Sequence, residues 1–414
     1  MTTYPLAERL GLPRLAGNGR LLAALAIDAL GSGLYLPFVL LFLVGWTGLG
    51  LVAVGATLTI ARTAAIPLGL FTGPLTDRLG PRPTLALSGA AQAAALGGYL
   101  ISDSVWEIGV FSLLAALGDG AFWVSIRSMT AAVVPAPQRP RWLGAQIALR
   151  NATFALGGVI ATTVMVNPSR YTMMGLAAAN AASFAVLALL IGTWRPRMLP
   201  DEPLGETSAP PSFRVVLADR AYLLFVAVNL LLVFAMTTPG LLLAVYVGEV
   251  LHGPLWLVGA CFTLETVLIA LGQTVVAKAI ERRSRSAALR WAVVAFAASF
   301  ALLAALPVVP ALLLGPGLIA VALLTTMANL LEGPSGIGIV TDAASDQVRG
   351  RYTAIYQLTW NVGKALTPGL AAWLLARAPS LPWLALLGCC TVAYILLLKL
   401  GRILPPSVDV AGGG

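Results

Sequence analysis

Eight ionisable side chains lie inside long apolar runs of this 414-residue chain. Four are acids and four are bases, namely Asp28, Asp119, Glu265, Glu332, Arg62, Arg127, Arg150 and Lys364. A charge at the centre of a bilayer costs about 2.5–3.5 kcal/mol on insertion scales, so such residues usually pair with one another or take part in proton and ion pathways. Because the eight charges sum to zero, pairing is the simplest explanation, and proton binding is the chemistry that the carboxylates would add.

Depth within the runs predicts two pairs in the first half of the chain. At ~1.5 Å of rise per residue, Asp28 lies about 10 Å from the edge of its run and Arg62 about 12–15 Å, whereas Asp119 lies at about 14–20 Å and Arg150 at about 13 Å. We therefore expect Asp28 to pair with Arg62 and Asp119 to pair with Arg150. The alternative for each pair is a static clamp between helices.

A third pair is expected in the second half, where Lys364 should face Glu265 or Glu332. A buried lysine–carboxylate pair can exchange a proton near neutral pH, which an arginine pair cannot. Asp28, Glu332, Glu265, Asp119 and Lys364 are therefore the proton-coupling candidates.

Polar residues also recur at helical spacing, which favours a polar face on several helices. Asp28, Ser32 and Tyr35 follow this spacing, as do Gln357, Asn361 and Lys364. The candidates for lining a substrate cavity are Tyr35, Trp123, Arg127, Gln146, Arg150, Asn229, Gln357, Trp360 and Asn361. Hydrogen bonding between helices, at about 0.6 kcal/mol per bond, is the alternative for the polar residues. Ordinary packing is the alternative for the two tryptophans.

The elements that must position these residues are membrane helices. With 58% hydrophobic and 10% charged residues and a mean hydropathy of +0.88, the chain has too little polar surface for a soluble globule. A membrane helix needs about 20 apolar residues. Twelve runs qualify, at 21–44, 49–72, 84–102, 107–134, 142–166, 171–193, 221–248, 254–279, 288–306, 312–343, 352–376 and 380–400.

Glycine and proline predict irregularities within three of these helices. Gly31, Gly33 and Pro37 should kink or soften the first helix, and Pro239-Gly240 should do the same in the seventh. The piece 333–336 should interrupt the tenth run.

The distribution of positive charge predicts the orientation. With the N-terminus inside, twenty of the 26 Lys and Arg fall in cytoplasmic loops, and only Arg170 and Arg377 fall outside. Such a bias places both termini in the cytoplasm of a multi-pass cell-membrane protein. It also accounts for the basic composition without a nucleic-acid partner.

The polar stretch 194–220 divides six runs from six, so we expect two six-helix bundles at 1–193 and 221–414 with a cytoplasmic linker between them. Polar pairs recur in the same order in both halves, as an internal repeat predicts. Asp77-Arg78 recurs as Glu281-Arg282, Asp28 as Asn229, Asp119-Gly120 as Glu332-Gly333, and Arg141-Trp142 as Arg351-Tyr352.

A charged turn between the second and third runs carries the most specific motif. It resembles the signature loop of the major facilitator superfamily, G-x-L-x-D-R-x-G-R-R, with Pro81 in place of the first basic residue. The matching residues are Gly73, Leu75, Asp77, Arg78, Gly80 and Arg82. The resemblance implies an all-α fold of twelve transmembrane helices in two pseudo-symmetric bundles that rock about a central cavity. It also implies a cytoplasmic gate, in which Asp77 caps the start of the eleventh helix.

Within that family the chain is most similar to the drug/proton antiporter branch. The similarity consists of an acid in helix 1 (Asp28), an arginine in helix 4 (Arg127) and an acid in helix 10 (Glu332), although Gly157-Gly158 in helix 5 lack the branch's proline. It implies a secondary active transporter that exports a small amphipathic compound in exchange for protons. The alternatives are a proton symporter for a polar nutrient, a lipid or glycolipid flippase, and a non-transporting sensor.

Enzymatic activity is not expected, because the sequence contains no phosphate-binding loop, metal cluster or nucleophile–base set. The three cysteines have no metal or disulfide spacing. We therefore expect no cofactor. The expected partners are a small-molecule substrate, protons and the lipid bilayer, and the protein is expected to be a monomer.

Overall fold

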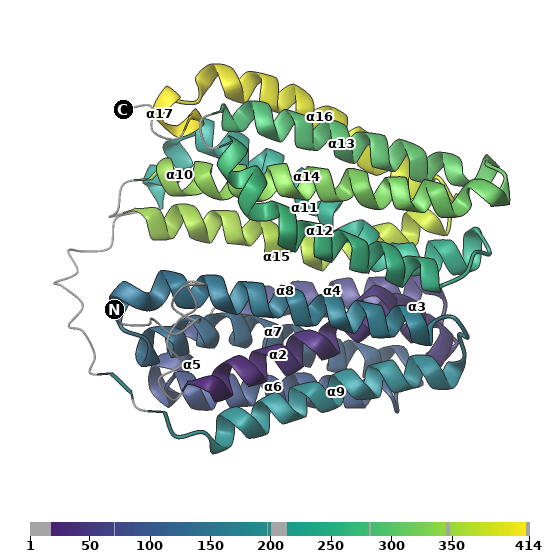
Figure 1. The fold of residues 1–414 in the computed structure, drawn as a ribbon, viewed down its shortest axis with the longest axis horizontal. Coiled ribbons are helices and arrows are strands. Elements are labelled where there is room, and N and C mark those ends of the chain that lie inside the picture. The colour runs from purple at the N-terminus through teal and green to yellow at the C-terminus, as the bar shows by residue number, and fades with distance from the viewer. Residues whose placement is uncertain are drawn as a thin grey trace, which may run out of the picture. The chain divides into compact units, whose positions relative to one another are not determined.

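The structure, a computed structural model, describes residues 18–69, 71–196, 198–199, 213–280, 283–344 and 348–410, except for the side chains of Ala136 and Pro140. Over these ranges the chain is helical and contains no strand. It divides into two compact units, Met1–Gly205 (unit 1) and Glu206–Gly414 (unit 2), and each is a helix bundle (Figure 1). Residues 200–212 of the expected linker and the repeat pair Glu281-Arg282 lie outside the described residues.

The helices of unit 1 follow the predicted runs closely. They are α2 (Gly19–Tyr35), η1 (Leu36–Phe38), α3 (Val39–Thr47), α4 (Leu51–Gly69), α5 (Thr72–Leu79), α6 (Pro81–Tyr99), α7 (Val105–Val133), η2 (Ala136–Gln138), α8 (Arg139–Val164) and α9 (Arg170–Thr193). Helix α7 begins with a capping box, in which Glu107 N donates to Ser104 Oγ and Ser104 N donates to Glu107 Oε2. This arrangement satisfies backbone donors that the first turn of a helix leaves free.

Unit 2 contains a second set of long helices. They are α10 (Arg214–Ala218), α11 (Arg220–Val245), the π-helical turn η3 (Tyr246–Val250), α12 (Trp256–Ile280), α13 (Arg285–Ala305), η4 (Leu306–Val308), η5 (Ala311–Leu313), α14 (Leu314–Asp342), α15 (Arg349–Leu375), α16 (Leu381–Ile403) and α17 (Pro406–Asp409). Asp219 caps α11, because its Oδ1 accepts a hydrogen bond from Tyr222 N.

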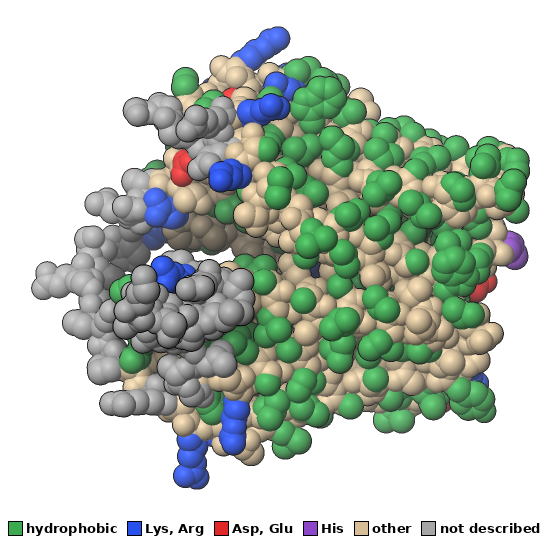
Figure 2. Space-filling view, in the orientation of Figure 1, with side chains coloured by type: hydrophobic (Ala, Val, Ile, Leu, Met, Phe, Trp, Pro, Cys, Tyr) green, Lys and Arg blue, Asp and Glu red, His purple; other side chains and the backbone are tan. Residues whose placement is uncertain are grey.

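Ten helical segments among the described residues are long and apolar enough to cross a membrane, and one of them joins α2, η1 and α3 into a single span. Helices α6 and α15 are as long as a span but less apolar, and they complete the predicted twelve. Hydrophobic side chains cover the helix lengths on the visible face, while Lys and Arg gather near one end of the helices (Figure 2). The predicted all-α multi-pass membrane fold is confirmed.

The two units pair their helices in the same order. In unit 1, α2 packs against α8 and α9, α6 against α7 and α9, and α4 against α7. In unit 2, α11 packs against α15 and α16, α13 against α14 and α16, and α12 against α14. The same pairing in corresponding helices is what an internal repeat of six helices produces.

Proline has different effects in the first and tenth spans. At Pro37 the α-helix gives way to the 3₁₀ turn η1, as the sequence predicts. The predicted interruption at residues 333–336 is wrong, because α14 continues as one helix with Pro334 inside it. Membrane helices tolerate an internal proline because neighbouring groups compensate for its missing backbone hydrogen bond.

Two glycines set the close approach of α2 and α8. A Cβ at Gly33 would lie 2.1 Å from the carbonyl oxygen of Phe154, and a Cβ at Gly157 would lie 2.2 Å from the carbonyl oxygen of Leu30. Small residues allow membrane helices to approach until their backbones touch. This crossing brings together the side chains that precede the two glycines on α2 and α8.

Gly157→Ala should therefore destabilise the protein by about 1–3 kcal/mol, because the added methyl group meets backbone atoms that cannot rotate away. Gly144→Ala, in the same helix, is the matched control, since nothing lies within 4 Å of its Cβ position. The control should be neutral or slightly stabilising, because alanine is the better helix former. Thermal unfolding of the purified variants in detergent measures both effects, and equal melting temperatures would contradict the prediction.

Candidate functional site

A buried ion pair joins α2 to α8 in the middle of unit 1. Arg150 Nη1 donates to Asp28 Oδ2 at 2.6 Å, with 3% of the Asp28 side chain exposed and 23% of the Arg150 side chain exposed. The predicted pairing of Asp28 with Arg62 is therefore wrong. Helix α2 packs along α8 and α9, whereas α4, which carries Arg62, packs along α7. The exposed Arg62 forms no ion pair with another described residue.

Aromatic rings connect this ion pair to the surface of unit 1. The Arg150 guanidinium lies 5.3 Å from the ring centre of Phe122 and 5.2 Å from that of Trp123, both on α7. Trp123 Nε1 in turn donates to Asp119 Oδ1 at 3.1 Å. The predicted direct pairing of Asp119 with Arg150 is therefore wrong. Arg150 pairs with Asp28, and Trp123 contacts both Arg150 and Asp119. A continuous series of contacts runs from buried Asp28 to the exposed residues Trp123 and Asp119.

These exposed polar residues lie near the midpoint of a membrane helix. Asp119, Trp123 and Arg127 are all exposed, at intervals of one helical turn along α7. Charged side chains at this depth almost always face a bundle interior or a water-filled cavity rather than lipid. We therefore expect the exposed stripe on α7 to face water and not lipid.

In unit 2 the contact at the position corresponding to Asp28 is made by uncharged groups. Helices α11 and α15 pair as α2 and α8 do, and Asn229 Nδ2 donates to Thr359 Oγ1 between them. Asn229 is the repeat counterpart of Asp28. A neutral hydrogen bond therefore occupies the position that an ion pair occupies in unit 1.

Glu332 on α14 has surroundings unlike those of Asp119, its repeat counterpart. It is 2% exposed, and its Oε1 has no hydrogen-bond partner among the described residues. The hydroxyl of Ser335, one turn further along α14, is also buried without a described partner. No described cation forms an ion pair with Glu332. Burial without a partner disfavours a charged carboxylate, so the neutral acid is the form that these surroundings fit.

Glu265 is bound to a neutral partner. Asn329, on the neighbouring helix α14, donates from Nδ2 to Glu265 Oε1 at 2.7 Å.

The predicted pairing of Lys364 with Glu265 or Glu332 is wrong, because Lys364 is exposed on α15 and its Nζ lies 5.9 Å from the ring centre of Trp360. Depth along a helix gave the level of Lys364 but not the direction in which it points.

Lys364→Met should consequently leave the melting temperature of the protein unchanged, because no buried carboxylate loses a partner. Thermal unfolding in detergent is the measurement, and unfolding at a clearly lower temperature would show that the amine stabilises the fold. The assignment of Lys364 to proton coupling stays a prediction, and Lys364→Arg tests it separately by keeping the charge while fixing the protonation state.

The other cavity candidates fall into two groups. Gln357 and Asn361 are exposed on the same face of α15 as Lys364. Tyr35 and Gln146 are buried inside unit 1, where Tyr35 packs edge-on against Phe42 and Gln146 Nε2 donates to Thr130 Oγ1 at 3.1 Å. Gln146 and Asn229 thus bond to neighbouring helices, whereas the buried Tyr35 hydroxyl has no partner among the described residues.

The signature turn forms a short helix followed by a left-handed glycine. Gly73, Leu75, Asp77 and Arg78 lie on α5, and Gly80 adopts φ 86°, which favours glycine. Arg82 donates from Nε to Ile191 O at 3.1 Å and from Nη2 to Gly192 O, so its guanidinium caps the last turn of α9. Asp77 is exposed at the end of α5.

The sequence analysis did not identify several residues of these sites. Phe122, Asn329 and Thr359 contact the ionisable or amide side chains, yet each resembles an ordinary helix residue in the sequence. The internal repeat is the one sequence signal for such contacts, because it aligns the residues around α8 with those around α15. No group of three or more His, Cys, Asp or Glu suited to a metal ion occurs in the described part of the chain.

Comparison with known proteins supports the predicted family and fold. The family model of the Major Facilitator Superfamily matches residues 21–331. The multidrug resistance protein MdtH of Salmonella typhimurium is 22% identical over 413 residues, covering 95% of this chain and 96% of that protein. MdtH of Shigella flexneri is 21% identical over 398 residues, covering 92% of each.

Solved structures share the fold at low sequence identity. A bacterial homologue of the iron transporter ferroportin, in the inward-facing state, superposes with a TM-score of 0.74 at 13% identity and covers 94% of this chain and 99% of its own. The nucleoside transporter NupG superposes with a TM-score of 0.70 at 14% identity and covers 92% of this chain and 98% of its own. With the family model matching most of its length, the chain belongs to the Major Facilitator Superfamily of transporters.

Proposed function

We propose that the protein exports a small amphipathic compound across the cell membrane in exchange for protons, with both termini in the cytoplasm. The similarity to MdtH along nearly the whole chain supports export of such a compound. The positive charge of the predicted cytoplasmic loops supports the orientation. Family membership supports alternating access as the mechanism, with one half rocking against the other.

The Asp28–Arg150 ion pair is the observation that carries the proton-coupling part of the proposal. The same fold joins α11 to α15 with the neutral pair Asn229–Thr359, so the joint between such helices does not need charge. Burying an ion pair seldom stabilises a protein more than an uncharged substitute would. An ion pair in unit 1, at a position where unit 2 has a neutral hydrogen bond, is better explained by a use for the charge.

Protonation gives the ion pair such a use. Arginine stays charged at any accessible pH, so Asp28 is the member of the pair that can take up a proton. A neutral Asp28 would hold Arg150 less strongly and leave the guanidinium free to move against Phe122 and Trp123. Because Trp123 also binds Asp119, a proton on a buried acid would change the exposed face of α7.

Everted membrane vesicles test the proposal. A panel of amphipathic compounds is first screened for growth protection in cells that express the protein, and the active compounds are then added to vesicles with an acidic interior. With the wild type, we expect addition of a transported compound to release protons from the vesicles, and a pH-sensitive dye measures this release. With Asp28→Asn, we expect no release. Movement of compound and protons in the same direction would instead favour the symporter.

The gate residue Asp77 gives a separate prediction. If it caps the start of α15 in one state of the cycle, as the family resemblance implies, the helix N-terminus favours its charge by about 0.3–1 kcal/mol. Asp77→Asn should therefore slow transport severalfold and leave the affinity for substrate unchanged. Equal losses of binding and transport, measured by equilibrium binding and vesicle uptake, would argue against a role as a gate.

A further inference from the structure

The buried carboxylate of Glu332 lies beside a stack of two aromatic rings in unit 2. A Cβ at Gly336, one turn further along α14, would lie 3.0 Å from Glu332 Oε1 and 3.9 Å from the ring atom Cζ of Phe225 on α11. Phe225 in turn stacks on Tyr356 of α15, with 6.3 Å between the ring centres and 5° between the ring planes. The missing side chain at Gly336 therefore leaves room for the acid next to rings from two other helices.

The Tyr356 hydroxyl is the polar group that these rings bring to the acid. It interacts electrostatically with the Glu332 carboxylate, and its side-chain hydrogen-bond partner is Trp360, one turn further along α15. An indole N–H can only donate, so the Tyr356 oxygen is the acceptor and its own proton stays available. Glu332 Oε1, which has no hydrogen bond among the described residues, is an acceptor without a donor. The two groups therefore complement each other.

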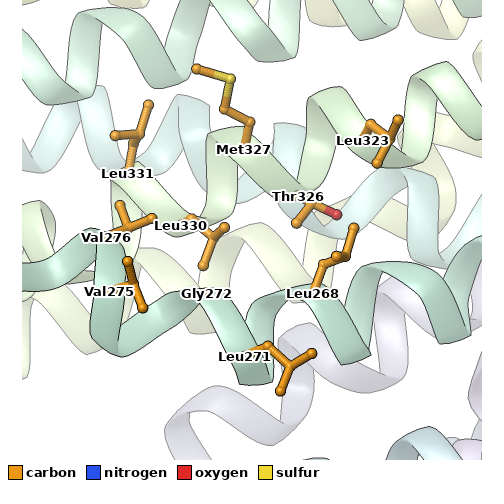
Figure 3. Close-up of a pocket in the computed structure, with 10 residues that line it drawn as sticks. All are labelled: Leu268, Leu271, Gly272, Val275, Val276, Leu323, Thr326, Met327, Leu330 and Leu331. Carbon is orange, nitrogen blue, oxygen red and sulfur yellow. The ribbon is translucent and has the colours of Figure 1, made fainter. Parts of the chain in front are cut away.

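The side of α14 that faces α12 is apolar next to Glu332. Leu330 and Leu331, the two residues before Glu332, line a groove of about 490 Å³ together with side chains of α12 such as Leu268 and Val276 (Figure 3). Glu332 is not among the lining residues. A proton that left the acid on this side would meet hydrocarbon side chains, which offer no hydrogen bonds.

Other titratable side chains on the helices around α14 are bound to partners of their own. The pairs are Glu265 with Asn329, Arg285 with Asp342, and Tyr222 with the backbone oxygen of Tyr352. Within the described part of unit 2, Tyr356 is then the titratable neighbour that faces Glu332 itself.

From Tyr356 the contacts lead to the exposed face of α15. Tyr356 and Trp360 are partly exposed, and Gln357, Asn361 and Lys364 are exposed on the same helix. A series of contacts thus runs from a buried acid to an exposed polar face in unit 2, as it does in unit 1.

We propose that the Tyr356 hydroxyl carries protons between Glu332 and the exposed face of α15. This inference rests on the proposed exchange of compound for protons and names the residue through which Glu332 takes part in it. In the described arrangement the hydroxyl and the carboxylate do not hydrogen-bond. Transfer therefore requires that they close to hydrogen-bond reach or share one bridging water.

The step is an exchange of protons along hydrogen bonds. Tyr356 Oη gives its proton to Glu332 Oε1 and takes another from a hydronium ion at the exposed face, which becomes water. The carboxylate becomes neutral, the phenol regains its proton, and the reverse step releases the proton again. Because a free phenol ionises at about pH 10, Tyr356 passes the proton on without holding a charge itself.

Infrared spectroscopy of the purified full-length protein in nanodiscs tests the proposal without requiring transport. The carbonyl band of a protonated carboxylic acid reports Glu332, and the part of this signal that Glu332→Gln removes assigns it. After a rapid pH jump, the rate at which the band changes is measured in the wild type and in Tyr356→Phe, which keeps the ring and its stack on Phe225. Tyr394→Phe is the matched control, because it removes a hydroxyl from an exposed position of α16.

We expect the Glu332 band to change about tenfold or more slowly in Tyr356→Phe and to reach the same final size, while the control follows the wild type. An unchanged rate in Tyr356→Phe would overturn the proposal. So would a change in final size at an unchanged rate, since the hydroxyl would then only alter the surroundings of the acid.

The failure of this proposal is distinguishable from the failure of the proposed export. Slower exchange in Tyr356→Phe, found together with no proton-linked transport by wild-type vesicles, would support the route through Tyr356 and contradict the exchange of compound for protons. Proton-linked transport by the wild type, found together with an unchanged rate in Tyr356→Phe, would support the export and overturn the route.

Discussion

Asp28→Asn should reduce proton-driven transport about tenfold or more, because it removes the one member of the buried ion pair that can bind a proton. It should also lower stability, since the Arg150 guanidinium loses its counter-charge. Breaking a buried pair costs about 3–5 kcal/mol, and the partial exposure of Arg150 places the expected loss at the lower end of that range. Uptake into everted vesicles and thermal unfolding in detergent measure the two effects separately.

A double variant distinguishes a role of the ion pair in proton coupling from a purely structural role. Asp28→Asn combined with Arg150→Gln removes both charges and leaves a neutral amide pair, much as unit 2 has Asn229 and Thr359 at its corresponding joint. We expect the double variant to regain most of the lost stability, because no charge is left unpaired. Its transport should remain uncoupled from the pH gradient. Recovery of both stability and coupled transport would reduce the ion pair to a structural clamp.

The membrane helices could be predicted from the sequence because the bilayer imposes their length. The run predicted at 171–193 became Arg170–Thr193, and the run at 142–166 became Arg139–Val164. Long apolar segments form helices in hydrocarbon, because a helix bonds its backbone polar groups within the segment. Pro37 marked a true change of helix type for a similar reason, since proline removes a backbone donor.

The ion-pair partners could not be predicted from depth. Depth gives the level of a residue along a helix, whereas contact also requires that two helices be neighbours and that both side chains point toward each other. Asp28 and Arg62 share a level, but the chain places α2 against α8. The signal for that neighbour lay in the glycines Gly33 and Gly157, whose missing side chains allow the close crossing.

Glu332→Gln should have a different outcome from Asp28→Asn, although both replace a buried acid by its amide. Glu332 has no described cation partner, and its Oε1 has no described hydrogen bond. The amide has nearly the shape of the neutral acid that these surroundings fit. We therefore expect the melting temperature to stay close to the wild-type value.

Transport should nevertheless fall about tenfold or more in Glu332→Gln, because the amide cannot release a proton at any stage of the cycle.

Two controls accompany this variant. Ser335→Ala removes a neighbouring hydroxyl that also lacks a described partner, and it should leave both transport and stability unchanged. Glu332→Asp keeps an ionisable group and should retain pH-dependent transport at a reduced rate. Measurements over a range of imposed pH gradients compare the three variants. If Glu332→Gln responds to the gradient as the wild type does, this acid does not carry the proton, and Glu265 becomes the next acid in unit 2 to be tested in the same way.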